Sequence, residues 1–262
     1  MIRISSLSKK FGRLTAIDEL TLNIPDGCIY GLIGSNGSGK STLLRMLAGI
    51  WKQDAGSIGY DGKPVFENPE VKASIAYISD DPYTERSASI SEMAGDLSLV
   101  YPHYDVPMAL KLAESSGLDP KRQFKTFSKG MLRQSYIILA LAAHPKYLLC
   151  DETFDGLDPV KRKAVRKLLA DAVAAQGTTV IIASHNLREL EDICDHVVLL
   201  HQGQQLISRN LDDMSTNIFK LQAAFEEPRH KKDFEAYKPV SFSHRGRMVS
   251  MVVRGTREDI EA

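Results

Sequence analysis

The sequence is poor in cysteine and shows no excess of charge of either sign. Its 262 residues include three cysteines, Cys28, Cys150 and Cys194, which lie far apart in apolar surroundings. This number and spacing favour reduced thiols in a core over a disulfide or a zinc site. Lys and Arg together number 33, as do Asp and Glu. The balance argues against a protein that binds nucleic acid by electrostatics, so no nucleic-acid partner is expected.

A long apolar run is also missing. The longest candidate extends from Tyr136 to Ala143 and stops at His144, well short of the roughly 18 apolar residues that a membrane-spanning helix needs. The first residues, Met1 to Ile4, lead directly into strand-like sequence without the apolar core and cleavage site of a secretory signal. We therefore expect a soluble, cytoplasmic protein, which can still sit against a membrane.

The sequence does contain a complete phosphate-binding loop. Residues 34–42 read GSNGSGKST, between an apolar stretch at 29–33 and a helical pattern at 43–47. The glycines let the backbone turn tightly and aim successive N–H groups at phosphate oxygens, and the following helix adds the positive end of its dipole. The residues expected to bind the nucleotide are Gly34, Ser35, Asn36, Gly37, Ser38, Gly39, Lys40, Ser41 and Thr42.

Two side chains of this loop have chemistry of their own. Lys40 is expected to reach the β- and γ-phosphates, and the hydroxyl of Ser41 is expected to ligate magnesium. The strand before the loop and the helix after it disfavour a merely flexible segment. We therefore predict a nucleoside triphosphate, such as ATP, and Mg2+ as ligands.

A second candidate site follows an apolar strand. Residues 147–150 read YLLC and are followed by the adjacent carboxylates Asp151 and Glu152. Ligands collect at the carboxyl end of a parallel sheet, where Asp151 would hold magnesium through water and Glu152 would polarise the water that attacks the γ-phosphate. Taken alone, such a run is more often an ordinary strand end. Its position behind a phosphate loop favours the catalytic interpretation.

The remaining patterns predict an α/β fold. Residues 1–30 and 55–66 carry short alternating segments with turns, which is typical of an antiparallel β-subdomain. Residues 87–123 show helical periodicity interrupted by Pro102 and Pro107, which predicts an inserted helical region. From residue 129 onward, helices and strands alternate as in a parallel sheet. We expect helices from about 129, at 160–175 and near 187–193, and strands at 147–150, 179–183 and 196–200.

In this order, the motifs resemble those of the ATP-binding subunit of an ABC transporter. The resemblance covers residues 1 to about 212. The matching features are the phosphate loop, a signature segment at 127–131, the pair Asp151 and Glu152, a D-loop at 155–158 and a switch histidine, His185. The resemblance implies ATP hydrolysis and a P-loop NTPase fold, with a parallel core sheet, an antiparallel β-subdomain and a helical subdomain at about 87–128.

The resemblance implies an active site shared by two subunits. Two such domains pack head to tail, and each ATP is held between the phosphate loop of one subunit and Ser128 and Gly130 of the other. The partner is therefore a second ATPase subunit, either an identical copy or a relative. In the D-loop, Asp155 and Asp158 would communicate between the two sites, although the same turn is also a plausible helix cap.

Two further residues receive a role through the resemblance. Phe11 matches the aromatic residue that stacks on adenine, although an early phenylalanine is more often a core residue. His185 matches a residue that contacts the γ-phosphate and positions Glu152. An isolated histidine after a buried strand is otherwise usually a satisfied polar residue at the start of a loop.

Two positions depart from the pattern of the family. The signature usually carries two glycines and then a glutamine, whereas this chain has Lys129, Gly130 and Met131 after Ser128. Ser128 and Gly130 remain, so the site is expected to work, with Lys129 either solvated or adding positive charge near ATP. Where the family has a glutamine that contacts magnesium, this chain has Asp80. Asp80 would ligate magnesium through water or take part in an ordinary turn.

The tail lies outside the secure part of the resemblance. We expect an ABC ATP-binding domain at 1–212 and a small C-terminal α+β appendage at 213–262, apparently incomplete. The appendage is predicted to contain strands at 219–225, 240–243 and 248–253 and the start of a helix at 256–261.

The leading hypothesis is therefore an ATPase subunit that powers transport of an unknown substrate through separate transmembrane permease subunits. Such a subunit would lie in the cytoplasm, peripheral at the inner face of the cell membrane. The alternative is a soluble ABC ATPase that acts as a mechanical switch on ribosomes or DNA. It is less favoured, because such relatives typically carry two cassettes, long coiled coils or zinc motifs, and none is visible in the sequence. Intact Lys40, Asp151 and Glu152 disfavour a regulator that binds ATP without hydrolysing it.

Overall fold

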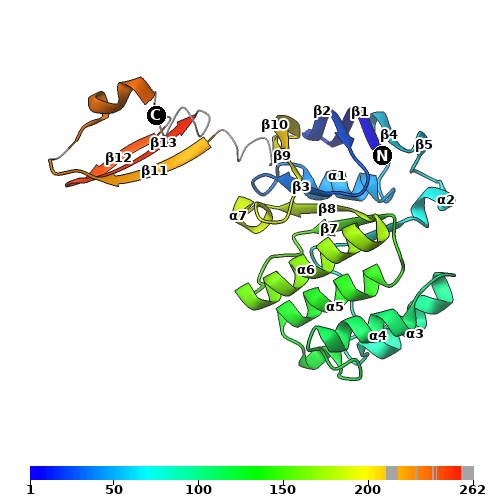
Figure 1. Ribbon diagram of the computed structural model, residues 1–262. Helices are drawn as coiled ribbons and strands as arrows, with labels where there is room; N and C mark the ends of the chain where they lie inside the picture. Colours follow the sequence, from blue (N-terminus) through cyan, green and yellow to red (C-terminus); the bar gives the residue numbers. More distant parts are fainter. Residues whose placement is uncertain (211–217, 228, 238, 240, 255–262) are drawn as a thin grey trace. The chain divides into compact units, whose positions relative to one another are not determined.

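The chain divides into two compact units, Met1–Ser208 and Arg209–Ala262. The computed structural model describes residues 1–210, 218–227, 229–237, 239 and 241–254 (Figure 1). The larger unit contains two sheets and most of the helices. In the described part of the chain, no helix is both long and apolar enough to cross a membrane.

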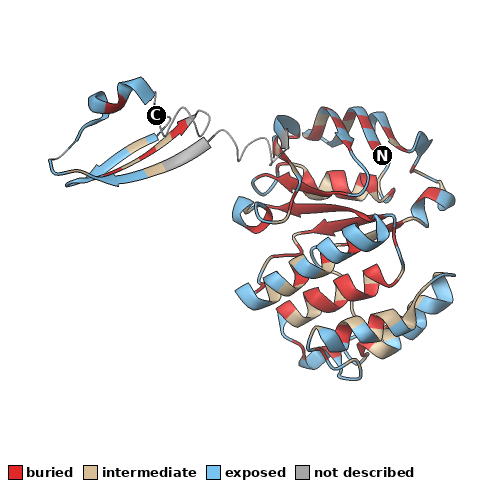
Figure 2. Ribbon diagram, in the orientation of Figure 1, coloured by how far each residue is buried: buried red, intermediate tan, exposed pale blue. Residues whose placement is uncertain are grey.

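A six-stranded sheet forms the centre of the larger unit. Its strands are β3 (Ile29–Ile33), β6 (Ile75–Ile78), β7 (Tyr147–Asp151), β8 (Thr179–Ser184), β9 (His196–His201) and β10 (Gln204–Asn210). The order is β10-β9-β3-β8-β7-β6, and the strands from β9 to β6 run parallel. Every residue of β3, β7 and β8 is buried, as the red strands in Figure 2 show. Burial on both faces explains why these strands read as continuous apolar runs, and the predicted parallel sheet is confirmed.

A second sheet is antiparallel, as predicted. Its strands are β1 (Ile2–Phe11), β2 (Leu14–Ile24), β4 (Ala55–Tyr60) and β5 (Lys63–Pro64), in the order β2-β1-β4-β5. Buried Ile2 and Ile4 alternate with exposed residues in β1, so one face of this sheet belongs to the core. Helix α1 (Lys40–Leu47) lies between the two sheets (Figure 1), and one apolar cluster joins all three.

Two long helices cover the face of the central sheet opposite α1 (Figure 1), and the signature segment and the D-loop lie at their starts. They are α5 (Lys129–Leu141) and α6 (Pro159–Gln176), with the short α2 (Pro69–Lys72) leading into β6. Helix α6 begins after Asp158, whose carboxylate accepts the N–H of Lys161, and ends at Gly177 with a φ of 67°. Its buried residues, Val165, Leu169 and Ala172, follow helical spacing, so one stripe faces the core.

An inserted helical region precedes α5, as the periodicity predicted. It contains α3 (Ile90–Val100), α4 (Val106–Ser115) and the 3-10 turn η1 (Phe124–Thr126). Helix α3 starts with a capping box, in which the side chains of Ser89 and Glu92 each bond the other's backbone N–H. Buried residues such as Ile90, Phe124 and Ile138 form a cluster of their own, so α3, α4 and α5 share a separate core.

Helix α7 is shorter than the predicted 187–193 and spans Leu187–Leu190. After Leu190 the chain continues as a turn, because the N–H of Cys194 donates to the carbonyl oxygen of Leu190. The carboxylate of Asp195 then accepts the N–H of Ile29 at 2.7 Å, which brings the chain back to the central sheet. Strand β9 begins at the next residue.

The smaller unit contains a three-stranded antiparallel sheet of order β11-β13-β12. Its elements are β11 (Ile218–Ala224), the 3-10 segment η2 (Lys231–Tyr237), β12 (Ser241–Arg245) and β13 (Met248–Arg254). Phe234 of η2 packs on Val249 and Met251. The three predicted strands are confirmed, η2 was not predicted, and the helix predicted at 256–261 lies outside the described residues.

The three cysteines are free and buried, as predicted. Burial raises the pKa of the Cys28 thiol to about 11 and the pKa values of Cys150 and Cys194 to about 12. These thiols therefore stay protonated at neutral pH and act as small apolar core groups.

Candidate active site

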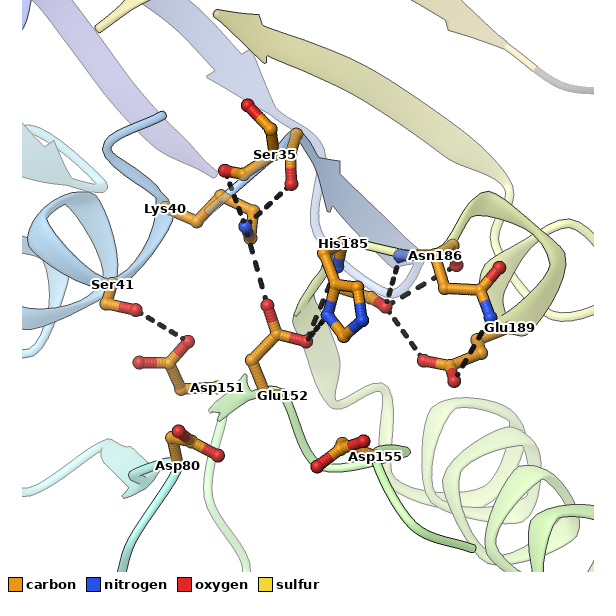
Figure 3. A network of polar contacts seen from close by, with 12 residues as sticks. Ser35, Lys40, Ser41, Asp80, Asp151, Glu152, Asp155, His185, Asn186 and Glu189 are labelled. Atoms are coloured by element: carbon orange, nitrogen blue, oxygen red, sulfur yellow. Dashed lines mark hydrogen bonds and ion pairs between the residues drawn. The ribbon is translucent and has the colours of Figure 1, made fainter. Parts of the chain in front are cut away.

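The phosphate loop, the carboxylate pair and His185 follow three neighbouring parallel strands. The loop follows β3, Glu152 follows β7, and His185 follows β8. Since β8 pairs with both β3 and β7, their carboxyl ends lie side by side at one edge of the sheet. Three segments that are far apart in the sequence therefore meet where parallel sheets bind ligands (Figure 3).

The backbone of the phosphate loop requires glycine. Gly37 and Gly39 have φ angles of 80° and 106°, which other residues rarely adopt. A Cβ atom on Gly39 would also lie 2.5 Å from the carbonyl oxygen of Ala16. Ser38 is buried, and its hydroxyl has no hydrogen-bond partner among the described residues. A side chain at position 39 would therefore disrupt the conformation of the loop.

The ammonium group of Lys40 lies inside this loop. Lys40 is 5% exposed, and its Nζ donates to the carbonyl oxygens of Gly34 at 2.7 Å and Ser35 at 3.3 Å. The same Nζ lies 3.4 Å from Oε1 of Glu152 (Figure 3). A buried cation thus stands within a glycine-rich loop that leads into a helix, the arrangement that binds phosphate.

Ser41 and Asp151 meet on the other side of the loop. The hydroxyl of Ser41 donates to Oδ1 of Asp151 at 3.0 Å. Burial raises the pKa of the Asp151 carboxyl, and the charges of Glu152 and Asp80 raise it further against the opposing hydrogen bond from Ser41. A divalent cation beside Asp151 would favour its charged form, so this carboxylate suits a metal site.

The donor set fits Mg2+. Within the described ranges, no group of three or more His, Cys, Asp or Glu side chains is placed to hold a metal ion. Mg2+ does not need such a cage, because it is usually bound by one or two carboxylates together with substrate phosphates and water. Ser41 and Asp151 beside the phosphate loop meet this requirement.

Glu152 is held from two sides. Its backbone has a φ of 48°, in the left-handed region that is uncommon for a residue other than glycine and that often marks functional sites. Its Oε2 lies 2.9 Å from Nδ1 of His185, opposite the contact between Oε1 and Lys40. The hydrogen bond to Glu152 raises the pKa of His185. The structure thus brings together Glu152, His185 and Lys40.

One pocket is lined by residues of the phosphate loop, by Glu152 and by the predicted base-binding residue. It has a volume of about 390 Å³. Its lining residues are Phe11, Leu14, Ala16, Asn36, Gly37, Gly39, Lys40, Ser41, Thr42, Asp80 and Glu152. Phe11 is 42% exposed, and its ring lies 5.1 Å from the ring of Trp51, centroid to centroid, in an edge-on contact. The pocket therefore combines an exposed aromatic ring with the phosphate loop and the carboxylates of Asp80 and Glu152.

The signature residues lie elsewhere, at the start of α5. Among the residues that line the described pocket, none is Ser128, Lys129 or Gly130. The hydroxyl oxygen of Ser128 accepts the N–H of Met131 at 3.3 Å, so Ser128 caps the helix. The free N–H groups and the dipole of this 13-residue helix favour an anion at this end.

Lys129 is tied to the D-loop. Its Nζ lies 2.6 Å from Oδ2 of Asp155, and this contact lowers the pKa of Asp155. Sequence reasoning offered solvation or a charge near ATP for Lys129 and missed this ion pair. Asp158 caps α6, which agrees with the structural reading of the D-loop turn. The D-loop and the signature segment are thus joined within one chain.

Asp80 lines the pocket, but its carboxylate is engaged. Oδ1 of Asp80 accepts a hydrogen bond from Nη2 of Arg133 at 2.8 Å. The expected role of Asp80 as a magnesium ligand stays a prediction. Sequence reasoning did not single out Arg133.

Comparison with known proteins decides the family. The profile of the family described as ABC transporter matches residues 17–155, more than half of the chain. The chain belongs to the ABC transporter family. Its geometry and this membership agree on an ABC ATP-binding domain that hydrolyses ATP, with the P-loop NTPase fold that the sequence predicted.

Relatives of known name support the same conclusion. The ABC transporter ATP-binding protein YtrB of Bacillus subtilis (strain 168) is 32% identical over 227 residues, which cover 86% of this chain and 77% of YtrB. The lantibiotic transport ATP-binding protein SrtF of Streptococcus pyogenes is 29% identical over 231 residues, 87% of this chain and 100% of SrtF. A solved structure of an ATP-binding subunit of an ABC transporter is 26% identical, with a TM-score of 0.73 over 82% of this chain and 91% of its own.

The ABC ATPase also uses a residue that sequence reasoning missed. Glu189 is 5% exposed and lies in α7, four residues after His185. Its Oε2 accepts a hydrogen bond from the hydroxyl of Ser184 at 2.8 Å, and its Oε1 lies 3.4 Å from Nδ2 of Asn186 (Figure 3). Glu189 thereby orders the loop that carries His185. In the sequence, the available signal for this residue was a glutamate in the short segment Leu187–Leu190, which follows a buried strand.

Proposed function

We propose that two such subunits form paired ATP sites and power transport through separate transmembrane permease subunits. The observation that supports this proposal most directly is the incompleteness of the pocket in one chain. Phe11, Lys40 and Glu152 share one pocket, whereas Ser128 and Gly130 lie outside its lining. Residues suited to a phosphate at the start of α5 can therefore serve a nucleotide that another subunit holds.

Within one chain, each group near the phosphates has a distinct task. Lys40 binds the β- and γ-phosphates, and Ser41 and Asp151 would hold Mg2+, which would offset charge on the phosphoryl oxygens. Glu152 accepts the proton of the attacking water. His185 orients Glu152 through the 2.9 Å contact and contacts the γ-phosphate.

The second subunit completes the site. Its Ser128 donates its hydroxyl hydrogen to the γ-phosphate, since the oxygen of that hydroxyl already accepts the N–H of Met131. Gly130 presents its backbone N–H there as well. The Lys129–Asp155 pair keeps the D-loop beside this segment, so both elements reach the partner together.

Membership of the family supports a proposal for the partners and the cellular location. We propose a catalytic domain at 1–212 with a helical subdomain at about 87–128, a small appendage at 213–262, and a peripheral position at the cytoplasmic face of the cell membrane. The name of SrtF concerns lantibiotic transport. We carry over only ATP-driven transport, with the substrate and its direction left open. The names of the relatives do not favour the alternative role on ribosomes or DNA.

Co-purification from membranes tests the transport role. The full chain, expressed with a tag in its native cells, is isolated from detergent-solubilised membranes, and the bound proteins are identified by mass spectrometry. We expect an integral membrane protein with several apolar spans, together with a second copy or a relative of this ATPase. Recovery of ribosomal or DNA-bound proteins in place of a membrane protein would contradict the proposal.

Phe11 is expected to contribute to binding through the adenine ring. Stacking of a base on an aromatic side chain contributes about 1–3 kcal/mol, so Phe11→Ala should weaken ATP binding by about fivefold to 150-fold in isothermal titration calorimetry. Inorganic tripolyphosphate has no base and serves as the matched control ligand. Its affinity should be the same for the two proteins, and an equal loss for both ligands would assign Phe11 to the fold instead.

A further inference from the structure

Arg133 is a buried cation that has no role in the proposed mechanism of ATP hydrolysis. It lies in α5, one helical turn after Lys129, and its side chain is 5% exposed. Nη2 donates to Oδ1 of Asp80 at 2.8 Å, and Nη1 donates to the carbonyl oxygen of Ser79 at 3.2 Å. Across the described residues, Asp80 is the one carboxylate within ion-pair distance of Arg133.

The two partners have unequal environments. The side chain of Asp80 is 59% exposed and can be solvated, whereas the guanidinium of Arg133 cannot. A guanidinium keeps its proton at any pH at which proteins fold, so Arg133 cannot become neutral to escape burial. Removal of Asp80 would leave a buried charge unpaired, whereas removal of Arg133 would leave a carboxylate that water can solvate. The first change should therefore destabilise the fold more than the second.

Asp80 also faces the metal side of the nucleotide pocket. It lines the pocket together with Lys40, Ser41 and Glu152. Its charge contributes to the raised pKa of Asp151, so the two carboxylates are within electrostatic reach of each other. A free Asp80 carboxylate would add negative charge where Mg2+ is held.

We propose that Arg133 is a positioning residue, which keeps Asp80 as its own counter-ion and thereby withholds that carboxylate from the metal ion beside Ser41 and Asp151. The proposal rests on the metal position given under the proposed function. If Asp80 turned away from Arg133 to reach the metal, the buried guanidinium would lose its counter-ion. The aspartate at position 80 and the arginine at position 133 are thus a matched pair, because a neutral side chain at position 80 would not balance the charge of Arg133.

The pair has a structural consequence as well. Asp80 follows β6 of the central sheet, and Arg133 lies one turn into the helix that starts with the signature segment. The ion pair therefore ties the edge of the nucleotide pocket to the helix that presents Ser128 and Gly130. Through this ion pair, Arg133 positions both Asp80 at the pocket and the start of α5.

Thermal unfolding of the full chain without nucleotide or metal provides the first test. Asp80→Asn leaves Arg133 buried and unpaired, and should lower Tm by about 4–8 °C. Asp80→Asn combined with Arg133→Gln should regain at least half of that loss, because the buried charge is gone. Asp81→Asn and Arg86→Gln are matched controls at exposed positions and should stay within about 1 °C of the parent chain.

Binding of Mn2+ to the complex with ADP, followed by electron paramagnetic resonance, provides the second test. Asp80→Asn should weaken Mn2+ binding by no more than about threefold, because the variant loses a nearby charge but not a ligand. Arg133→Gln should strengthen it by about threefold to tenfold, because the released carboxylate adds a charge near the metal. Because loss of the positive charge of Arg133 alone can raise metal affinity, the gain from Arg133→Gln is compared with its gain in the Asp80→Asn background, where it should be smaller.

The outcomes separate the two proposals. If Asp80→Asn weakens Mn2+ binding tenfold, or Arg133→Gln leaves it unchanged, Asp80 is not withheld from the metal and the inference is wrong. An equal Tm for Asp80→Asn and Asp81→Asn would also overturn it. Ser41→Ala tests the metal position itself. If that variant keeps the parent affinity for Mn2+, the metal position of the proposed function fails first.

Discussion

Replacement of Glu152 by glutamine is expected to lower the rate of ATP hydrolysis by about 10²–10⁴-fold while ATP still binds. The amide has the shape of the carboxylate but cannot accept the proton of the attacking water. Lys40 would keep its bonds to the carbonyl oxygens of Gly34 and Ser35, so the phosphate loop should hold its form. Single-turnover hydrolysis gives the rate, and calorimetric titration gives the affinity for ATP.

The same variant should accumulate an ATP-bound pair of subunits. If two chains close around ATP and hydrolysis reopens them, Glu152→Gln should elute as a dimer with ATP and as a monomer without it in size-exclusion chromatography. Glu191→Gln is a matched control, because Glu191 is an exposed glutamate just after α7. That control should hydrolyse ATP at the parent rate. Normal turnover by Glu152→Gln would remove Glu152 from the role of base.

The parts of the site that the sequence predicted are those whose chemistry is local. The phosphate loop has its glycines, lysine and serine in one run of nine residues, 34–42, and each position follows from what phosphate binding requires. The strands β3, β7 and β8 could be predicted because burial on both faces demands continuous apolar runs. Their carboxyl ends then placed the loop, Asp151 and His185 at one edge.

The parts that escaped prediction are pairings between distant residues. Lys129 and Asp155 are 26 positions apart, and Arg133 and Asp80 are 53 positions apart. No spacing rule connects them, because the contacts arise only when α5 packs beside the D-loop and the end of β6. For this reason a sequence reading treats Lys129 and Asp80 as isolated departures. The structure turns each of them into one half of an ion pair.

Element ends were less predictable than element types for a similar reason. Helix α7 ends at Leu190, and five residues later Asp195 bonds the backbone of Ile29 in β3, which ties this segment to the central sheet. In the 3-10 segment η2, Phe234 is the buried residue and packs on the small sheet, so its helical turn had no periodic signal. Tertiary contacts decided both cases.

Replacement of Lys40 by alanine is expected to lower ATP hydrolysis by about 10²–10³-fold or more and to weaken ATP binding as well. The side chain supplies the buried positive charge of the phosphate loop, and its Nζ also lies 3.4 Å from Glu152. A steady-state phosphate-release assay measures turnover. Lys63→Ala is a matched control, because Lys63 is an exposed lysine paired with Glu70, and its loss should leave turnover at the parent rate. Retained turnover by Lys40→Ala would refute the phosphate-loop interpretation.

A loss of folding must be separated from a loss of charge at Lys40. Without the ammonium, the carbonyl oxygens of Gly34 and Ser35 lose a donor, so thermal unfolding is measured beside activity, and Lys40→Met keeps the apolar stem as a second variant. If Lys40 and Glu152 serve one step, the double variant Lys40→Ala with Glu152→Gln should be no slower than the more impaired single variant, because groups that act as a unit are not additive. Multiplied losses would mean that the two residues act in separate steps, with the contact between them incidental to catalysis.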